Sequence, residues 1–399
     1  MRKPTLTIFY QYNPWQSTIG GIQSLINTFI RFAPETFDLR LVGTGINNGK
    51  PVGEWYEAEL MGRSLQFFPL FTLLDDNVRK IVPTTVRYTA ALLKRTLQSD
   101  FMHFHRLEPT LAARGWSGDK TLFVHNDIQQ QIQSAKGANS ILWQRFPQLY
   151  FWLEEQLLKQ FDQVLSCNSA TTRFYQQRYP ALADRVVDVK NAVDTTYFQP
   201  LSHGAEQEER QRLLRQLNLA NDTRLILFAG RLHPQKDPLL LLETIASAPA
   251  DSNIHLLIAG DGDLRAEVEQ TIREKKLSQR VSMLGPVERE RMVKLYQVAD
   301  VFVLSSRYEG LPISMLEALA CGTPIVTTDC GQGPQLLTSG SGIVVSERHP
   351  QTLGNAIARV LDTPQQFTTA ACLQAVAPYS AEQVMLSIYD DMLSRWRSP

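Results

Sequence analysis

Short apolar runs alternate with segments of helical period along most of the chain. Strands of a parallel sheet are buried on both faces, so their sequences are nearly continuous runs of Val, Ile, Leu and Phe. The pattern therefore predicts an α/β protein with doubly wound parallel sheets. In the first half of the chain, the candidate strands lie at residues 6–10, 39–43, 101–105, 121–125, 163–167 and 186–190.

The pattern is interrupted once and then restarts. Residues 199–221 are less apolar and contain the charged run 206–212, where we expect a linker followed by the first helix of a second domain. Apolar residues at helical spacing between 380 and 396 predict a last helix. The candidate strands of the second half lie at residues 225–229, 255–259, 281–284, 301–304, 324–327 and 342–345. We therefore expect two sheets of about six strands each.

The length of the chain indicates how many domains it has, and its charge bears on whether it binds nucleic acid. A chain of 399 residues exceeds what one hydrophobic core usually supports. We expect an N-terminal domain at 1–198, a C-terminal domain at 199–379, and a helix at 380–399 that returns to the N-terminal domain. Lys plus Arg equal Asp plus Glu at 40 each, so no excess of cations attracts nucleic acid, and we expect no nucleic-acid partner.

The cysteines and the apolar runs bear on the cellular setting. The four cysteines form no CxxC pair, no zinc-ligand spacing and no disulfide framework, which favours a reducing cytoplasm. The first apolar run is too short for a signal peptide, and no run approaches the roughly 18 to 20 uncharged residues that span a bilayer. We expect a cytoplasmic protein.

The densest chemical signal follows the candidate strand 301–304. Open α/β sheets bind ligands at the carboxyl ends of their strands, so the residues just after each strand matter most. We expect a helix to begin near Pro312, because proline is favoured at the first helical position. The amides around Gly310, Leu311 and Ile313, together with the positive end of the helix dipole, would then form an anion site for a diphosphate.

Two glutamates flank this predicted helix start. Glu309 lies in the loop and Glu317 lies eight residues further on, so up to about 12 Å of helix rise separates them. This separation suits a ligand with two hydroxyl-rich ends, such as a sugar and a ribose joined by phosphates. The alternative to a ligand-binding role is that the two glutamates only flank the start of a helix.

The stretch from Glu-Gly-Leu-Pro to Ala-Cys-Gly-Thr-Pro at 309–324 resembles glycosyltransferase family 4, the retaining GT-B enzymes whose marker is two glutamates with seven residues between them. The resemblance covers nearly the whole chain. It implies two Rossmann-like domains facing each other across a cleft, of which the first (1–198) would bind the acceptor and the second (199–379) the donor. The donor would be a nucleotide-diphosphate sugar, and the acceptor a glycan, a lipid-linked molecule or a small molecule. It also implies that no cofactor or metal is needed. By the same resemblance, Glu309 would hold hydroxyls of the donor sugar and Glu317 those of the ribose.

A second signal is the loop Gly230-Arg231-Leu232-His233-Pro234-Gln235-Lys236 after the candidate strand 225–229. A guanidinium and an ammonium beside a leaving diphosphate stabilise charge that grows in the transition state. In the family that the chain resembles, Arg231 and Lys236 would have this role, with Gly230 lining the donor site. The alternative is a solvated basic loop.

Three further positions resemble donor-site residues of the family. Gly20 and Gly21 follow the first strand, where the lack of a Cβ lets backbone approach a ligand closely. His125 ends the candidate strand 121–125 and would lie against the donor sugar. Asn191 stands in the family's Asn-Gly-Val-Asp turn, here with Ala192 in place of glycine. For His103 and His105, which alternate in the preceding strand, a structural role is favoured.

Several other patterns carry less weight. The glycines of 43–49 imitate a dinucleotide-binding loop, but the third glycine is one residue late and no helix follows. The sequence Asp261-Gly262-Asp263 imitates a metal motif but suits a strand-to-helix turn, so we predict no metal. Gln335 replaces an acid usual in the family, and no role is transferred to it.

Three alternatives stay open. One is a nucleotide-sugar 2-epimerase, which shares the fold and would convert donor without an acceptor. Another is a sugar-binding relative without activity. The third concerns the aromatic run 141–161, which serves either the core of the first domain or a peripheral contact with a membrane surface, helped by Arg87, Lys94 and Arg95.

Overall fold

The chain divides into two compact units. The computed structural model describes residues 2–15, 21–45, 51–73, 83–125, 147–167, 169–249 and 252–397. The first unit comprises Met1–Gln16, Ile22–Asn191 and Glu382–Pro399, and the second comprises Ser17–Gly21 and Ala192–Ala381. The main chain therefore passes from one unit to the other between Asn191 and Ala192, and returns between Ala381 and Glu382.

The first unit is built on an eight-stranded sheet with the order β3-β4-β2-β1-β5-β6-β7-β8. All neighbouring strands are parallel except β3 and β4. The strands are β1 (Thr5–Phe9), β2 (Asp38–Gly45), β3 (Tyr56–Leu60), β4 (Arg63–Thr72), β5 (Phe101–Phe104), β6 (Asp119–Val124), β7 (Gln163–Ser166) and β8 (Val186–Asp188). The six runs predicted in this half are all strands.

The expectation of about six strands in this sheet was wrong, because β3 and β4 were not foreseen. Their two-residue turn, Met61-Gly62, has φ values of 55° and 72°, the left-handed geometry of a tight hairpin. The sequence of β3, Tyr-Glu-Ala-Glu-Leu, is half polar because it forms the edge of the sheet. β4 contains Pro69, which counts against a strand when only the sequence is considered.

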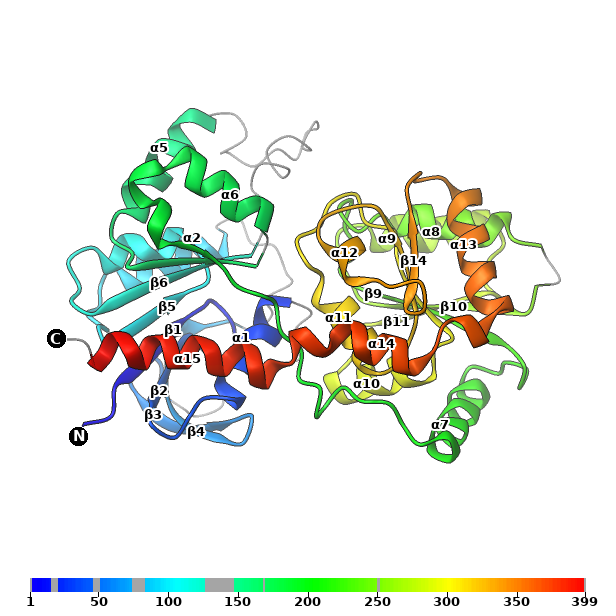
Figure 1. Cartoon of the computed structure of the whole chain (residues 1–399), viewed down its shortest axis with the longest axis horizontal. Helices are drawn as coiled ribbons and strands as arrows, with labels where there is room; N and C mark the ends of the chain where they lie inside the picture. Colours follow the sequence, from blue (N-terminus) through cyan, green and yellow to red (C-terminus); the bar gives the residue numbers. More distant parts are fainter. Residues whose placement is uncertain are drawn as a thin grey trace. The chain divides into compact units, whose positions relative to one another are not determined.

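Helices cover the first sheet, and the C-terminal helix is one of them (Figure 1). They are α1 (Gly21–Arg31), α2 (Thr84–Leu92), α5 (Pro147–Leu158), α6 (Ser169–Arg178) and α15 (Ala381–Arg397), with the short 3₁₀ turns η1 (Glu108–Ala113) and η2 (Pro180–Arg185). In α15, the buried Tyr389 packs against the Phe29 ring and donates a hydrogen bond of 2.9 Å to the Phe29 carbonyl oxygen. The predicted return of the last helix to the N-terminal domain is confirmed.

The second unit is built on a six-stranded, fully parallel sheet with the order β11-β10-β9-β12-β13-β14. The strands are β9 (Arg224–Ala229), β10 (Ile254–Ala259), β11 (Val281–Gly285), β12 (Val301–Leu304), β13 (Ile325–Thr328) and β14 (Gly342–Val345). All six were predicted. Counted from β9, the order is 3-2-1-4-5-6, that of a Rossmann domain, and the direction of winding reverses between β9 and β12.

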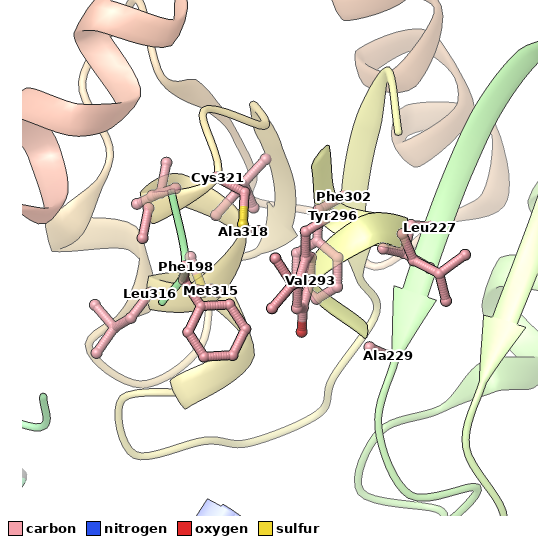
Figure 2. Packing of buried hydrophobic residues seen from close by; sticks show 14 of the residues in the cluster. Phe198, Leu227, Ala229, Val293, Tyr296, Phe302, Met315, Leu316, Ala318 and Cys321 are labelled. Atoms are coloured by element: carbon pink, nitrogen blue, oxygen red, sulfur yellow. The ribbon is translucent and has the colours of Figure 1, made fainter. Parts of the chain in front are cut away.

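Helices cover both faces of the second sheet, and each face has its own core. They are α7 (His203–Gln216), α8 (Pro238–Ser247), α9 (Arg265–Glu274), α10 (Arg289–Val298), α11 (Ile313–Ala320), α12 (Gly333–Leu336), α13 (Pro350–Asp362) and α14 (Thr369–Val376), with the turns η3 (Pro364–Gln366) and η4 (Ala377–Tyr379). Figure 2 shows the core under α10 and α11, where Tyr296 packs between Phe198 and Phe302. The opposite core lies under α8, α9 and α13. The doubly wound architecture is confirmed in this unit.

Candidate active site

The loops after β9 and β12 meet at the point where the winding of the second sheet reverses. Crevices at such switch points, beyond the carboxyl ends of the strands, are where open α/β sheets bind ligands. Several hydrogen bonds join the two loops. The amide of Arg307 donates to the carbonyl oxygen of Gln235 at 2.7 Å, the Gln235 side-chain amide donates to the carbonyl oxygen of Tyr308 at 3.0 Å, and the Ser305 hydroxyl donates to the Lys236 carbonyl oxygen at 3.0 Å.

Within this junction the structure brings together two residues singled out from the sequence. The Lys236 ammonium forms an ion pair with Oε1 of Glu309. The hydroxyl of Ser306 donates to the same oxygen at 2.6 Å. The Glu309 side chain is 8% exposed and that of Lys236 is 18% exposed, so the pair is shielded from most of the solvent. A cation and an anion are thus held side by side at the switch point, beyond the carboxyl ends of β9 and β12.

A second charged cluster supports the first and was not found from the sequence. Asp237 has left-handed backbone (φ 46°), and its side chain accepts a hydrogen bond from the amide of Leu240 at the start of α8. Its Oδ2 also forms ion pairs with Arg307 at 2.8 Å and Arg348 at 2.5 Å. An Asp directly before a Pro is a usual helix start, so the cap was visible in the sequence. The two arginines were not, because they come from other loops.

The segment before α11 differs slightly from its prediction. Pro312 has extended backbone (φ −66°, ψ 124°) and precedes the helix, so it is not the first helical residue; Ile313 is. Pro312 has no polar group to offer as a cap, and no side chain of the described residues caps this helix. The amides of the first turn are therefore suited to an anionic ligand. Gly310 and Leu311 lie in the segment that leads into this turn.

The loop after β13 braces this segment. Gly331 has φ +65°, and a Cβ atom there would lie 2.4 Å from the carbonyl oxygen of Glu309 and 2.5 Å from that of Gly310. The amide of Gln332 donates to the Gly310 carbonyl oxygen at 3.0 Å. Only glycine permits this approach, so Gly331 helps to hold the backbone on which Glu309 is carried.

Glu317 lies on α11, where the hydroxyl of Tyr296 donates to its Oε2 at 3.0 Å. Burial raises the pKa of the Glu317 carboxyl from 4.5 to about 7, against the lowering effect of the Tyr296 hydrogen bond and of the Arg289 charge. A carboxylate that is costly to ionise in the free protein gains most from hydroxyl donors, which is the property expected of a ribose-binding glutamate.

Arg231 and Gly230 begin the loop that ends in Lys236. Arg231 is exposed, and no hydrogen bond or ion pair holds its side chain among the described residues. The Lys236 side chain packs over Gly230, and the loop after β10 presses on the Gly230 carbonyl, where a Cβ on Gly260 would come within 1.9 Å. Lys236 and Glu309 are therefore joined directly, whereas Arg231 shares only their loop.

The first unit has a pair of histidines of its own at the carboxyl edge of its sheet. His125 follows β6, and its Nε2 lies 2.9 Å from Nδ1 of His105, which follows β5. Burial lowers the pKa of His125 to about 3, with a smaller effect from Arg106. His103 is 1% exposed between Phe29 and Phe123, as a core residue would be. His105, by contrast, is bonded to the predicted site residue.

The remaining predicted positions are spread over both units. Gly21 is the first residue of α1, while Gly20 lies outside the described residues. Asn191 is 7% exposed and is the last residue before the chain enters the second unit. Roles for these residues, and for the others singled out from the sequence, remain predictions.

The described residues of the two motifs that resemble a dinucleotide loop and a metal site, 43–49 and 261–263, lie in a strand and in a strand-to-helix turn. Gly43 and Gly45 lie within β2, and the rest of that loop, 46–50, is outside the described residues. Asp261 lies between β10 and α9, where it accepts from the amide of Gly262 at 2.8 Å. Across the part of the chain that the structure describes, no cluster of three His, Cys, Asp or Glu side chains could hold a metal ion.

The aromatic run 141–161 has a mixed environment. Residues 141–146, including Trp143 and Phe146, lie outside the described residues. Phe161 is fully buried in the core of the first unit, whereas Trp152 on α5 is 58% exposed. None of the helices in the described ranges is both long and apolar enough to span a bilayer.

The chain is similar to known proteins in both sequence and fold. Residues 209–371 match the family model described as Glycosyl transferases group 1. The chain is 29% identical to D-inositol 3-phosphate glycosyltransferase of Geodermatophilus obscurus over 59% of its own length and 53% of that protein. It thus spans about half the length of this curated relative.

Two solved structures are similar over the whole chain. Sucrose-phosphate synthase of Thermosynechococcus elongatus has a TM-score of 0.79 at 18% identity, covering 98% of this chain and 99% of the other. HepE of Anabaena in complex with UDP-glucose has a TM-score of 0.71 at 15% identity, covering 98% and 100%. At such low identities these similarities establish the fold alone: two Rossmann-like domains, the GT-B fold.

Proposed function

We propose that this chain, which has the GT-B fold and matches the group 1 glycosyl transferases over residues 209–371, transfers a sugar from a nucleotide-diphosphate sugar to a hydroxyl of an acceptor. The observation that carries the proposal is the ion pair of Lys236 and Glu309 at the switch point between β9 and β12. Its neighbour is the uncapped start of α11, which suits a diphosphate.

Each group around this point suits one part of the donor. The first-turn amides of α11 and the side chains of Arg231 and Lys236 would bind the diphosphate, Glu309 the sugar hydroxyls and Glu317 the ribose hydroxyls. A bound diphosphate offers Lys236 a second anionic partner, which lets Glu309 turn to neutral hydroxyls. The fact that the structural neighbour HepE was solved with UDP-glucose supports a donor of this class.

The proposed reaction proceeds with retention. The bond between the anomeric carbon and the leaving phosphate oxygen breaks, and the acceptor oxygen bonds to the same face of that carbon. The acceptor proton passes to the departing diphosphate, whose growing charge is stabilised by Arg231, Lys236 and the helix amides. No carboxylate is placed as a nucleophile in this scheme, and neither metal nor cofactor takes part.

The proposed acceptor is a glycan, a lipid-linked sugar or a small molecule, bound by the first unit. We propose a cytoplasmic location. Where the acceptor is lipid-linked, the exposed Trp152 on α5 offers a peripheral contact at the inner face of the membrane.

Thermal stabilisation by a panel of UDP-, GDP- and ADP-sugars tests the proposal. A ligand at 100 times its Kd stabilises the folded protein by about 2.7 kcal/mol, so one donor should raise the melting temperature clearly. The matching nucleoside monophosphate, which lacks the diphosphate, is the control and should have a much smaller effect. If no nucleotide sugar stabilises the protein, the proposal fails.

Product analysis with the stabilising donor then separates the enzyme classes. Transfer to an acceptor with the anomeric configuration kept supports the proposed reaction. An epimerised nucleotide sugar formed from donor alone would indicate the 2-epimerase. Tight donor binding with neither transfer nor donor hydrolysis would indicate a sugar-binding protein without activity.

A further inference from the structure

The two histidines at the carboxyl edge of the first sheet form a single coplanar unit. β5 and β6 are parallel neighbours, with Phe104 paired to Leu122. Continuing this register, His105 comes level with Phe123, and His125, two residues further on, points to the same face of the sheet. The ring centres of His105 and His125 are 5.1 Å apart at an interplanar angle of 14°, with 2.9 Å between the facing nitrogens. The ring centres are much further apart than the facing nitrogens, so the two rings lie edge to edge, and the small interplanar angle puts them in nearly one plane. This is the geometry of an N–H···N hydrogen bond.

Neighbouring aromatic rings hold His105 in this plane. The Phe123 ring lies 4.7 Å from it at 12°, and the Tyr10 ring meets it edge-on at 6.1 Å. His105 is 5% exposed. Burial, and then the neighbouring His125, lowers the pKa of His105 well below its usual value. Both rings are therefore neutral at neutral pH, and one proton lies between the facing nitrogens.

We propose that His105 is a positioning residue that sets the ring orientation and the tautomer of His125. The proposal rests on the proposed function, with His125 lying against the donor sugar as the sequence resemblance implies, and deepens it. With Nε2 engaged by His105, His125 has only Nδ1 left for a ligand, and the proton shared by the pair determines whether Nδ1 donates or accepts.

The pair has a chemical consequence for glycosyl transfer. Positive charge develops at the anomeric carbon as a glycosidic bond breaks. An imidazolium beside that carbon would oppose this charge, whereas a neutral imidazole offers a directed hydrogen bond to a sugar hydroxyl without repulsion. A second histidine serves this purpose better than a carboxylate partner, because a carboxylate would favour the protonated ring.

Nitrogen NMR on the chain labelled with ¹⁵N-histidine tests the pairing directly. We expect one of the two facing nitrogens to carry hydrogen and the other to be bare, with a scalar coupling across the hydrogen bond. Spectra of His105→Phe and His125→Phe assign the signals. In His105→Phe, which keeps the stacking on Phe123, His125 should change to a mixture of tautomers. An unchanged His125 signal in that variant would overturn the proposal.

His103→Phe is the matched control. His103 lies two residues earlier on β5, is 1% exposed, and neither of its ring nitrogens has a hydrogen-bond partner among the described residues. The same substitution there removes a buried imidazole without touching the pair. The coupling between His105 and His125 should persist in His103→Phe.

Turnover of the donor found in the stabilisation panel tests the consequence. His105→Phe should lower kcat by about tenfold with KM little changed, as when an orienting partner is lost. His105→Asn, whose amide lies where Nδ1 was, should recover much of kcat, and His103→Phe should stay close to the unaltered chain. Loss of the coupling with full kcat would overturn the positioning role. A chain that turns over no donor would count against the proposed function, while the NMR comparison would still decide the pairing.

Discussion

The contact between Lys236 and Glu309 matters for the stability of the fold as well as for the proposed chemistry. The pair is largely shielded, so removing one partner leaves the other charge poorly compensated. Arg231, in the same loop, is exposed and unpaired within the described part of the chain. The two cations therefore make different structural contributions, although both are expected to stabilise the leaving diphosphate.

Substitution of the two cations should separate these contributions. Arg231→Ala and Lys236→Ala should each lower kcat by about 10²-fold, with a smaller loss of donor affinity, because the diphosphate charge grows in the transition state. Only Lys236→Ala should also lower stability, by about 2 kcal/mol, as measured by chemical unfolding. Lys294→Ala, which removes an exposed cation of the same unit, is the control. Equal losses of kcat and affinity would contradict the assignment.

Glu317 is expected to make donor binding depend on pH. Its pKa is raised from 4.5 to about 7, so the carboxylate is lost as pH falls through 7. Donor affinity should then fall by up to about tenfold per pH unit below that value. Tyr296→Phe removes a hydrogen bond that lowers this pKa, so the midpoint should move to higher pH. Isothermal titration at several pH values measures both, and Glu317→Gln should give a flat profile.

The same shift affects stability with a defined sign. A carboxyl whose pKa is raised on folding binds its proton more tightly in the folded state. The resulting stabilisation is complete below pH 4.5 and is lost as pH rises through about 7. The free energy of unfolding of Glu317→Gln should therefore depend less steeply on pH between these values than that of the unaltered chain.

At the scale of elements, the site depends on loops that brace one another. The segment after β12 carries Glu309, and the loop after β13 lies against its backbone at Gly331. Ser306 and Thr328 add a further link, since the Thr328 hydroxyl donates to the Ser306 carbonyl oxygen at 2.7 Å. Three neighbouring strands of one sheet thus end in loops that define a single backbone arrangement.

Gly331→Ala tests this bracing. The substitution combines a left-handed backbone with overlap against two carbonyl groups, so it should destabilise the protein by more than the roughly 1 kcal/mol of backbone strain alone and should weaken donor binding. Gly285→Ala is the matched control. Its φ of +67° is nearly the same as the +65° of Gly331, but the nearest atom to an added Cβ is a flexible Arg265 nitrogen at 4.0 Å. Equal effects of the two substitutions on unfolding would show that the contact with Glu309 and Gly310 is unimportant.

At the scale of the whole molecule, the two crossings between units lie side by side. Val193 pairs with Ser380 in a parallel bridge, and Ala381 donates its amide to the Val193 carbonyl oxygen at 2.8 Å. The second unit therefore begins and ends at the same place, apart from the short segment Ser17–Gly21. It also has cores of its own on both faces of its sheet.

A chain limited to residues 192–381 should therefore fold alone. We expect a single cooperative unfolding transition and stabilisation by the nucleoside diphosphate of the preferred donor. The corresponding first fragment, 1–191, lacks α15 and the buried Tyr389, and should unfold at lower temperature than the same fragment with 382–399 added in trans. Circular dichroism melting curves measure both, and a fragment 192–381 that melts without cooperativity would contradict the expectation.

The sequence by itself determined the class of fold and which two loops meet at the switch point of the second sheet. Strands buried on both faces are visible as apolar runs because each position must avoid water, whatever its neighbours are. The carboxyl ends of parallel strands share one edge, so the loops carrying Lys236 and Glu309 could be assigned to one site. The antiparallel β3 and β4 escaped this reasoning, because an edge strand is half polar and Pro69 argues against a strand.

Only the tertiary structure decided which side chains meet. Arg348 reaches Asp237 across 111 positions of sequence, and His105 meets His125 only because β5 and β6 are neighbours in register. The spacing of apolar residues in a segment indicates which of its side chains are exposed to water. It contains no information about the order of strands in a sheet or about the partner of a charge, since these depend on how separate elements pack together.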